Sequence, residues 1–170
     1  MGWAWLIILL ATYPWLLGAD LLSDLLAPSA LLCFITGACL IAPCQRLPRW
    51  QCVLFAAATG FLFEARRPIP DGLLALTLVA AAIFLSSNRP LLRSVPRALQ
   101  AAAIVNGAAC LCWLAGVAFV TPGPAGELNG HAFTQFGCAL LLGFLALAPV
   151  AATQHAVMDR LGVAPAADQP

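Results

Sequence analysis

A run of twenty residues without a charged side chain, AAAIVNGAACLCWLAGVAFV, extends from Ala101 to Val120. A helix needs about 20 apolar residues to cross the ~30 Å hydrocarbon core of a membrane. The strands of a transmembrane barrel instead alternate apolar and polar side chains, and this run does not alternate. Because every backbone polar group must be satisfied internally within lipid, the run predicts a transmembrane α-helix.

The composition of the whole chain agrees with this interpretation. Of its 170 residues, 62% are hydrophobic and only 9% are charged, and the mean hydropathy is +0.94. A soluble domain carries about 25% charged residues, since its surface must face water. The sequence therefore predicts an all-α, polytopic membrane helix bundle. A net charge of +1 gives no reason to expect a nucleic-acid partner.

Clusters of proline and glycine divide the chain into six apolar segments. We expect transmembrane helices at roughly Trp3–Leu17, Ser29–Pro43, Cys52–Phe63, Leu73–Leu85, Ala98–Thr121 and Thr134–His155. The first segment lacks a basic flank and a small-residue cleavage site, so we expect a retained helix rather than a signal peptide. Residues 1–161 then form one six-helix domain, and the Ala/Pro-rich residues 162–170 a disordered tail.

The distribution of arginine predicts the orientation of the bundle. With the N-terminus in the cytoplasm, two arginines fall on the outer side, Arg66 and Arg67, and six on the inner side. The inner six are Arg46, Arg49, Arg89, Arg93, Arg97 and Arg160. Basic residues in short loops favour the cytoplasmic side. We therefore expect a multi-pass protein of the bacterial inner (cytoplasmic) membrane with both termini inside.

Polar and small residues within the apolar segments are expected to serve packing. The seven cysteines include no C-x-x-C pair and are interpreted as small hydrophobic residues between helices. Asn106 is expected to hydrogen-bond to another helix. The spacings Ala103-x-x-x-Gly107 and Cys112-x-x-x-Gly116 allow close helix approach. They fit either packing within the bundle or a docking face for another membrane protein.

The one concentration of charge lies between the third and fourth segments. Glu64, Arg66, Arg67 and Asp71 fall within eight positions of a chain that otherwise avoids charge. Charges near hydrocarbon are costly unless they pair or reach the interface, so we expect ion pairs of Glu64 with Arg67 and of Arg66 with Asp71. The loop either neutralises itself at the interface, or it orders the bundle and shapes a partner site.

The same stretch resembles the signature of the rod shape-determining protein MreD family. That signature has a glycine, an acidic residue four positions later, a turn, and a Leu-Gly-x-x-Ala-Leu element that opens the next helix. Gly60 and Glu64 have this spacing, and Gly72, Ala75 and Leu76 follow at the family's offsets. The chain departs from the signature at three points. The acidic residue is Glu64 where the family usually has Asp, the turn contains two arginines, and the residue before Gly72 is Asp71 where the family has an apolar residue. Pro149 and the Asp159-Arg160-Leu161 exit give a second, weaker similarity.

The resemblance implies a function without catalysis or cofactors. MreD-like proteins are non-enzymatic partners of the bitopic membrane protein MreC in the elongation complex, which links the cytoskeleton to peptidoglycan synthesis and cell shape. Their fold is similar to that of the S components of energy-coupling-factor transporters. The residues implied for turn architecture and partner contact are Gly60, Glu64, Arg66, Arg67, Asp71, Gly72 and Ala75.

Two other classes of function compete with the scaffold. A small-molecule-binding S component would need polar groups converging on a pocket at the outer face, and the candidates are Asn129, His131, Gln135 and Tyr13. A membrane enzyme would need a nucleophile, a base or a metal cluster facing one cavity. The two histidines, His131 and His155, are predicted at opposite membrane faces, and the sequence has no H-E-x-x-H or G-x-S-x-G motif. We therefore expect no catalytic and no metal-binding residues.

Overall fold

The computed structural model describes residues 2–26, 32–65, 72–120 and 125–163, except for the side chains of 118–120 and 125–132. The described part contains six α-helices, one short 3₁₀ helix and no strand. The α-helices are α1 (Ala4–Leu25), α2 (Thr36–Arg46), α3 (Arg49–Glu64), α4 (Leu73–Ser87), α5 (Val95–Val120) and α6 (Ala125–Arg160). The 3₁₀ helix η2 (Arg89–Arg93) joins α4 to α5. The all-α prediction is confirmed.

Three of the helices are long and apolar enough to cross a membrane, as expected of a membrane protein. They are Ala4–Leu25, Val95–Val117 within α5, and Phe133–Arg160 within α6. The outside of the bundle carries large apolar side chains, among them Leu10 (64% exposed), Ile104 (68%) and Leu145 (64%). A surface of this kind is favourable in lipid and unfavourable in water.

Three predicted segment boundaries are wrong. The sixth segment was expected to begin at Thr134, whereas α6 begins at Ala125. The first apolar segment was expected to end at Leu17, whereas α1 continues to Leu25 and takes Asp20 into the helix. The second was expected to begin at Ser29, but the described residues before Thr36 are not helical, and α2 has only 11 residues. Hydropathy alone does not separate a buried extended segment from a buried helix, because both are apolar.

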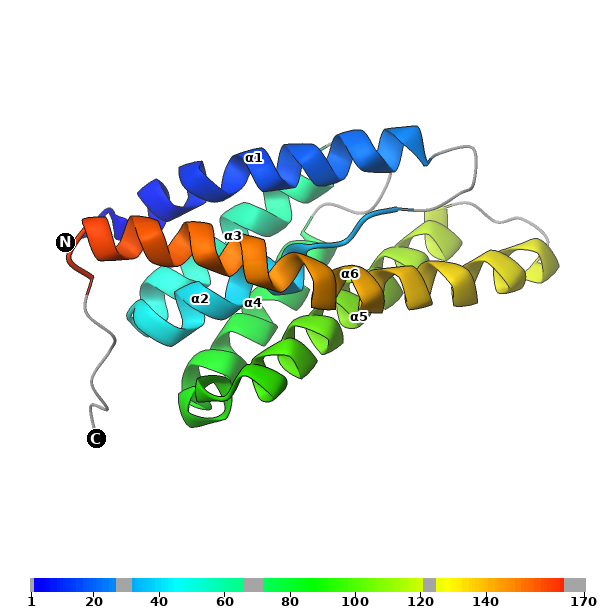
Figure 1. Cartoon of the computed structure of the whole chain (residues 1–170). Helices are drawn as coiled ribbons and strands as arrows, with labels where there is room; N and C mark the ends of the chain where they lie inside the picture. Colours follow the sequence, from blue (N-terminus) through cyan, green and yellow to red (C-terminus); the bar gives the residue numbers. More distant parts are fainter. Residues whose placement is uncertain (1, 27–31, 66–71, 121–124, 164–170) are drawn as a thin grey trace.

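Helices α1 and α6 lie side by side along the bundle, and α1 begins at the end where α6 finishes (Figure 1). The turn between α2 and α3 and the 3₁₀ helix η2 lie at this end as well (Figure 1). We call it the arginine end, because the helix ends and turns there carry Arg46, Arg49, Arg89, Arg93, Arg97 and Arg160. Helix α3 ends and α4 begins away from this end (Figure 1).

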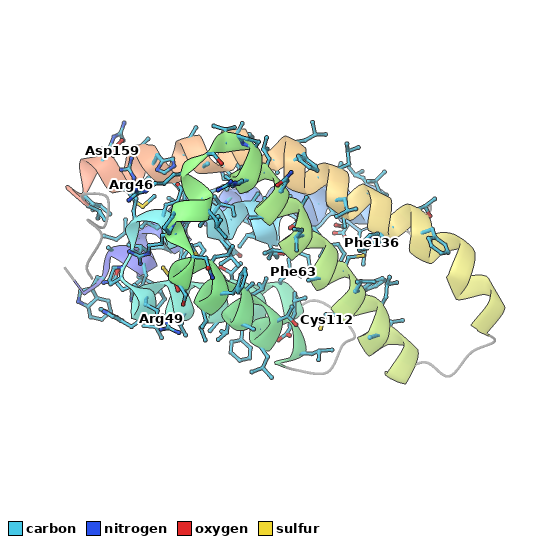
Figure 2. The ribbon with its side chains drawn as sticks, turned by 90° about the horizontal axis from the view of Figure 1, so that it is seen from below. Arg46, Arg49, Phe63, Cys112, Phe136 and Asp159 are labelled. Atoms are coloured by element: carbon cyan, nitrogen blue, oxygen red, sulfur yellow. The ribbon has the colours of Figure 1, made fainter. Side chains whose placement is uncertain are left out.

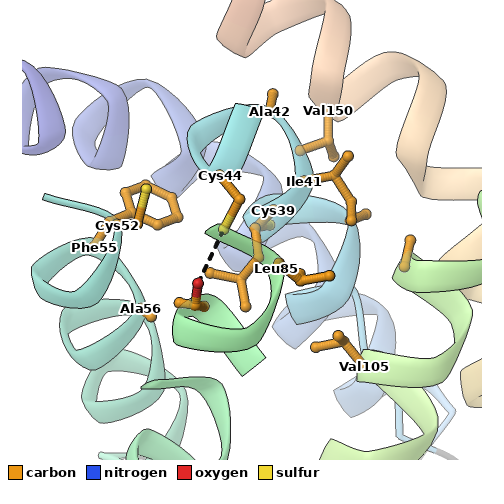
Figure 3. Close-up of a cluster of buried hydrophobic side chains, with 14 of the residues drawn as sticks. Cys39, Ile41, Ala42, Cys44, Cys52, Phe55, Ala56, Leu85, Val105 and Val150 are labelled. Carbon is orange, nitrogen blue, oxygen red and sulfur yellow. Dashed lines mark hydrogen bonds between the residues drawn. The ribbon is translucent and has the colours of Figure 1, made fainter. Parts of the chain in front are cut away.

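Helix α2 lies at the centre of the bundle, where it contacts every other α-helix. Its residues from Thr36 to Cys44 are all buried. The main hydrophobic core surrounds it, with side chains from α3, α4, α5 and α6 (Figure 3). The cysteines of this region pack as predicted: Cys39, Cys44 and Cys52 are fully buried and form no disulfide. The Cys44 thiol lies 4.0 Å from the Ala82 carbonyl oxygen of α4 (Figure 3).

The C-terminal end of α6 is closed by a left-handed glycine. Gly162 has a φ of 65°, and the Val163 N–H donates to the Met158 carbonyl at 3.0 Å. This arrangement satisfies carbonyls that a helix end leaves without partners. Of the predicted tail at 162–170, residues 164–170 lie outside the described residues.

Candidate functional site

Glu64, the last residue of α3, caps the N-terminus of α4. Its side chain is buried, and its Oε2 accepts a hydrogen bond from the Gly72 N–H at 2.8 Å. Its Oε1 accepts from the N–H groups of Leu74 and Ala75, the latter at 3.1 Å. The first N–H groups of a helix have no partners within the helix, and a carboxylate there also interacts favourably with the helix dipole. One side chain therefore fixes the start of α4 to the end of α3.

Gly72 gives the backbone the conformation that this cap requires. Its φ is +88°, in the left-handed region, where residues with a Cβ atom are disfavoured. Its carbonyl oxygen accepts the first helical hydrogen bond of α4, from the Leu76 N–H at 2.9 Å. Glycine at this position thus turns the chain into α4 and directs its own N–H to the Glu64 carboxylate.

Gly60, one helical turn before Glu64, brings the two helices together. A Cβ atom at Gly60 would lie 2.4 Å from the Ala75 Cα and 2.8 Å from the Ala75 nitrogen. Atoms this close cannot coexist, so α3 and α4 can pack at this distance only because residue 60 has no side chain. We call Gly60, Glu64, Gly72 and Ala75 the α3–α4 turn unit.

The turn unit contains four of the seven predicted site residues. The other three, Arg66, Arg67 and Asp71, lie outside the described residues, as do both predicted ion pairs. The sequence prediction missed the contact that the structure gives Glu64, which is to backbone N–H groups. A capping box places its acid inside the capped helix, whereas Glu64 precedes Gly72 by eight residues and belongs to the previous helix.

Asn106 on α5 joins three parts of the bundle, which confirms its predicted role as a link between helices. Its Oδ1 accepts from the Gly37 N–H of α2 at 2.6 Å. Its Nδ2 donates to the Phe34 carbonyl at 2.5 Å and to the Ala139 carbonyl of α6 at 3.3 Å. The side chain is fully buried, where such polar groups need partners. These bonds hold the segment before α2 between α5 and α6.

Small residues allow the backbones around Asn106 to approach closely. A Cβ atom at Gly37 would lie 2.2 Å from the Ala102 carbonyl oxygen, and one at Gly143 would lie 2.9 Å from the Ala103 Cα. At Gly107 a Cβ atom would meet the Phe136 ring of α6 at 3.0 Å. Of the two interpretations of the small-residue spacings, packing within the bundle is therefore the one observed for Ala103 and Gly107.

Phe34, Phe63 and Trp113 form an aromatic cluster away from the arginine end. The ring centroids of Phe34 and Phe63 are 5.3 Å apart, and Trp113 of α5 meets Phe34 edge-on at 6.2 Å. Such aromatic pairs contribute about 0.5–1.5 kcal/mol beyond the area they bury. Figure 2 labels Phe63 beside Cys112 of α5 and Phe136 of α6. The cluster packs the segment before α2 against the end of α3, beside the turn unit.

The candidate pocket residues of a small-molecule binder are not brought together among the described side chains. Both polar atoms of the Gln135 amide bond to Leu32. The Gln135 Oε1 accepts from the Leu32 N–H at 2.8 Å, and the Gln135 Nε2 donates to the Leu32 carbonyl at 2.8 Å. Tyr13 is exposed on α1 and lines a small cavity of about 90 Å³ with residues of α1 and α3. The side chains of Asn129 and His131 lie outside the described residues.

At the arginine end, Arg46 of α2 forms an ion pair with Asp159 of α6 (Figure 2). Their side chains are 20% and 64% exposed. Arg89 of η2 donates to the Leu47 carbonyl, and Gln45 donates to the Leu92 carbonyl at 2.8 Å. These contacts attach η2 and α6 to the end of α2. Among the side chains that the structure describes, no group of three or more His, Cys, Asp or Glu could hold a metal ion.

A scan against protein-family models, a search of curated proteins and a search of solved structures found no match for this chain. The similarity to the MreD signature therefore depends on the residues of this sequence themselves. Four of these, the α3–α4 turn unit, form one connected arrangement.

Proposed function

We propose that the chain is a non-enzymatic inner-membrane scaffold of the cell-elongation machinery, similar to MreD, which docks a bitopic MreC-like partner. The observation that supports this proposal is the α3–α4 turn unit. The residues that follow the family's spacing also contact one another. Gly60 packs against Ala75, and the Glu64 carboxylate accepts hydrogen bonds from the N–H groups of Gly72 and Ala75. If these residues matched the signature only by chance, we would not expect them to contact one another.

The turn unit suits a scaffold because it fixes both ends of the charged loop. Residues 65 and 72 flank the segment that carries Arg66, Arg67 and Asp71. The capped start of α4 is held against the end of α3, so the two residues that flank this loop have defined positions. In the proposed orientation it faces the outside, where the larger part of a bitopic partner would contact it. The charges of the loop then set the register of the partner.

In this proposal all six segments cross the membrane, including the one that contains the short helix α2. The four non-helical residues 32–35 can reach at most about 13 Å at ~3.3 Å each, and the 11 residues of α2 add about 16 Å. Together they match the ~30 Å of a hydrocarbon core. Non-helical backbone is tolerated at this depth only where protein covers it. Here Ser23, Gln135 and Asn106 bond to Cys33, Leu32 and Phe34.

Both termini are placed in the cytoplasm in this proposal. Six of the eight arginines belong to the arginine end, and basic residues in short connections favour the cytoplasmic side. A reporter fused to the C-terminus, active only in one compartment, tests this orientation. Activity of a periplasm-specific reporter would contradict it.

Co-purification with the MreC-like partner from bacterial membranes tests the scaffold role. We expect Glu64→Ala to reduce recovery of the partner more than Glu127→Ala does, because Glu64 organises the turn and charge is not concentrated around Glu127. A double substitution, Arg66→Gln with Arg67→Gln, leaves the cap intact and removes the basic residues of the loop. Unchanged recovery of the partner with both the Glu64 and the loop variants would overturn the assigned docking site.

A further inference from the structure

An apolar groove runs between α4 and α5, outside the turn unit. Its volume is about 540 Å³, within the range of about 300–1,000 Å³ typical of ligand pockets. Most of its lining is Ala, Leu, Ile, Val and Phe from α4, η2 and α5, including Ala80, Phe84, Ile104 and Ala108. The two helices lie side by side in Figure 1, with η2 connecting them at the arginine end.

The polar lining of the groove is concentrated at one end. Asn88, Arg97 and Gln100 lie where α4 ends and α5 begins, whereas the remainder of the lining is apolar apart from Thr77 at the far end. The groove is thus amphipathic along its length, with a cationic mouth at the arginine end and an apolar interior.

The mouth of the groove has an excess of positive charge. Between residues 72 and 126 the sequence holds three arginines, Arg89, Arg93 and Arg97, and no Asp or Glu. Arg97 is exposed, and α4, η2 and α5 contain no Asp or Glu. The guanidinium of Arg97 therefore lies beside an apolar groove without a carboxylate from its own or the adjoining helices. An anionic group would complement it.

The length of the groove corresponds to one leaflet of a bilayer. On α5 its lining extends from Arg97 to Ala108, and on α4 from Asn88 to Thr77. Eleven helical steps cover about 16 Å, roughly half of the ~30 Å hydrocarbon thickness. A transmembrane helix of a partner would cross the full thickness of about 30 Å. The groove matches only about half of that length, which suits a lipid of one leaflet better than a transmembrane helix.

We propose that this groove binds one anionic phospholipid of the leaflet at the arginine end. An acyl chain lies along the apolar walls, and the phosphate contacts Arg97 at the mouth, with Asn88 and Gln100 as further hydrogen-bond donors. Basic pockets between transmembrane helices on the cytoplasmic side recognise anionic headgroups in this way. The inference is independent of the scaffold role, because the groove shares no residue with the turn unit.

Native mass spectrometry of the full-length protein in mild detergent tests the proposal, with phosphatidylglycerol and phosphatidylcholine of identical acyl chains as probes. We expect the wild type to bind one phosphatidylglycerol about fivefold more tightly than phosphatidylcholine. Both lipids carry a phosphate, but only phosphatidylglycerol brings a net negative charge to Arg97, because the quaternary ammonium of phosphatidylcholine neutralises its own phosphate. Arg97→Gln should abolish this preference. Arg160→Gln, an exposed arginine at the same end but outside the groove, should retain it. Ala108→Trp should fill the groove and weaken binding of both lipids.

Three results would overturn the proposal. If Arg97→Gln and Arg160→Gln reduced the preference for phosphatidylglycerol equally, the lipid would be attracted to the basic surface in general and not to the groove. Undiminished binding to Ala108→Trp would place the lipid elsewhere, and Ala80→Trp on the opposite wall makes the same test if the first variant fails to fold. Cross-linking from position 108 to a second polypeptide in membranes, without any phosphatidylglycerol preference, would show that a protein occupies the groove.

Discussion

Gly60 on α3 lies so close to Ala75 on α4 that a Cβ atom at Gly60 would be 2.4 Å from the Ala75 Cα. The obstructing atoms belong to the backbone, which cannot rotate away as a long side chain can. A methyl group at this position must therefore move one helix relative to the other. The same displacement would pull the Glu64 carboxylate away from the N–H groups that it holds.

We expect Gly60→Ala to lower the free energy of unfolding by about 1–3 kcal/mol, the usual cost of overpacking a core. The direction is informative, because alanine in an unobstructed helix is more favourable than glycine by roughly 0.5–1 kcal/mol. Thermal unfolding in detergent, followed by circular dichroism, measures the change. The matched control is Gly18→Ala in α1, where a Cβ atom would meet nothing within 4 Å. Equal stability of the two variants would contradict the close approach.

Replacing Glu64 should destabilise the start of α4 in proportion to the acceptors lost. Glu64→Ala leaves the N–H groups of Gly72, Leu74 and Ala75 without their acceptor, and we expect a loss of about 1–3 kcal/mol. Glu64→Gln keeps one acceptor oxygen and should lose less. Hydrogen exchange of the amides at 72–75 reports the effect locally, and it should accelerate in the order wild type, Gln, Ala.

The control for this series is Asp24→Ala, because Asp24 is an exposed carboxylate on α1. Its stability should stay within about 0.5 kcal/mol of wild type. Amide exchange at 72–75 that is no faster in Glu64→Ala than in this control would exclude the cap.

The all-α class could be predicted from the sequence, because charged residues are scarce and long apolar runs recur throughout the chain. The role of Glu64 as a helix cap could not be predicted. Its partners are backbone N–H groups that the turn between α3 and α4 brings close, and backbone groups leave no pattern in the sequence. The charge around residues 64–71 drew attention to the segment in which Glu64 caps α4. The predicted arginine partners of Glu64 lie outside the described residues, so those ion pairs stay predictions.

The segment before α2 illustrates a second limit of sequence reasoning. Residues 32–35 are as apolar as a helix, and the expected second helix included them. Their non-helical backbone is held by hydrogen bonds to Asn106 and Gln135, which are 70 or more positions away. The sequence identified Asn106 as a link between helices, but not that it links to non-helical backbone.

Substitution of Asn106 should therefore disturb the centre of the bundle. Asn106→Leu keeps a similar volume but leaves the Gly37 N–H and the Phe34 carbonyl without their partner. Interhelical bonds in membranes contribute about 0.6 kcal/mol on average, whereas an unsatisfied buried group costs about 1–3 kcal/mol. We expect a loss of roughly 2 kcal/mol, since two buried backbone groups are left unpaired.

Detergent unfolding with Asn88→Ala as the control measures this loss. The Asn88 amide bonds only to the Phe84 carbonyl of the preceding helix, at 2.9 Å, so its removal should cost no more than a few tenths of a kcal/mol, the range of surface changes. Similar stabilities of the Asn106 and Asn88 variants would show that the link at Asn106 is not important for stability.

The ion pair between Arg46 and Asp159 should contribute far less than the buried bonds of Glu64. Its carboxylate side chain is 64% exposed, and exposed pairs contribute about 0–1 kcal/mol because water and salt screen them. We expect Asp159→Asn to change stability by less than about 1 kcal/mol, with the difference shrinking further as salt rises toward 1 M, where the screening length falls to ~3 Å. A double-mutant cycle with Arg46→Gln isolates the pair. A coupling of about 2 kcal/mol or more that persists at high salt would mean that α2 and α6 are held together at the arginine end by this pair, and that this end, rather than the Glu64 cap, is the electrostatically fixed part of the bundle.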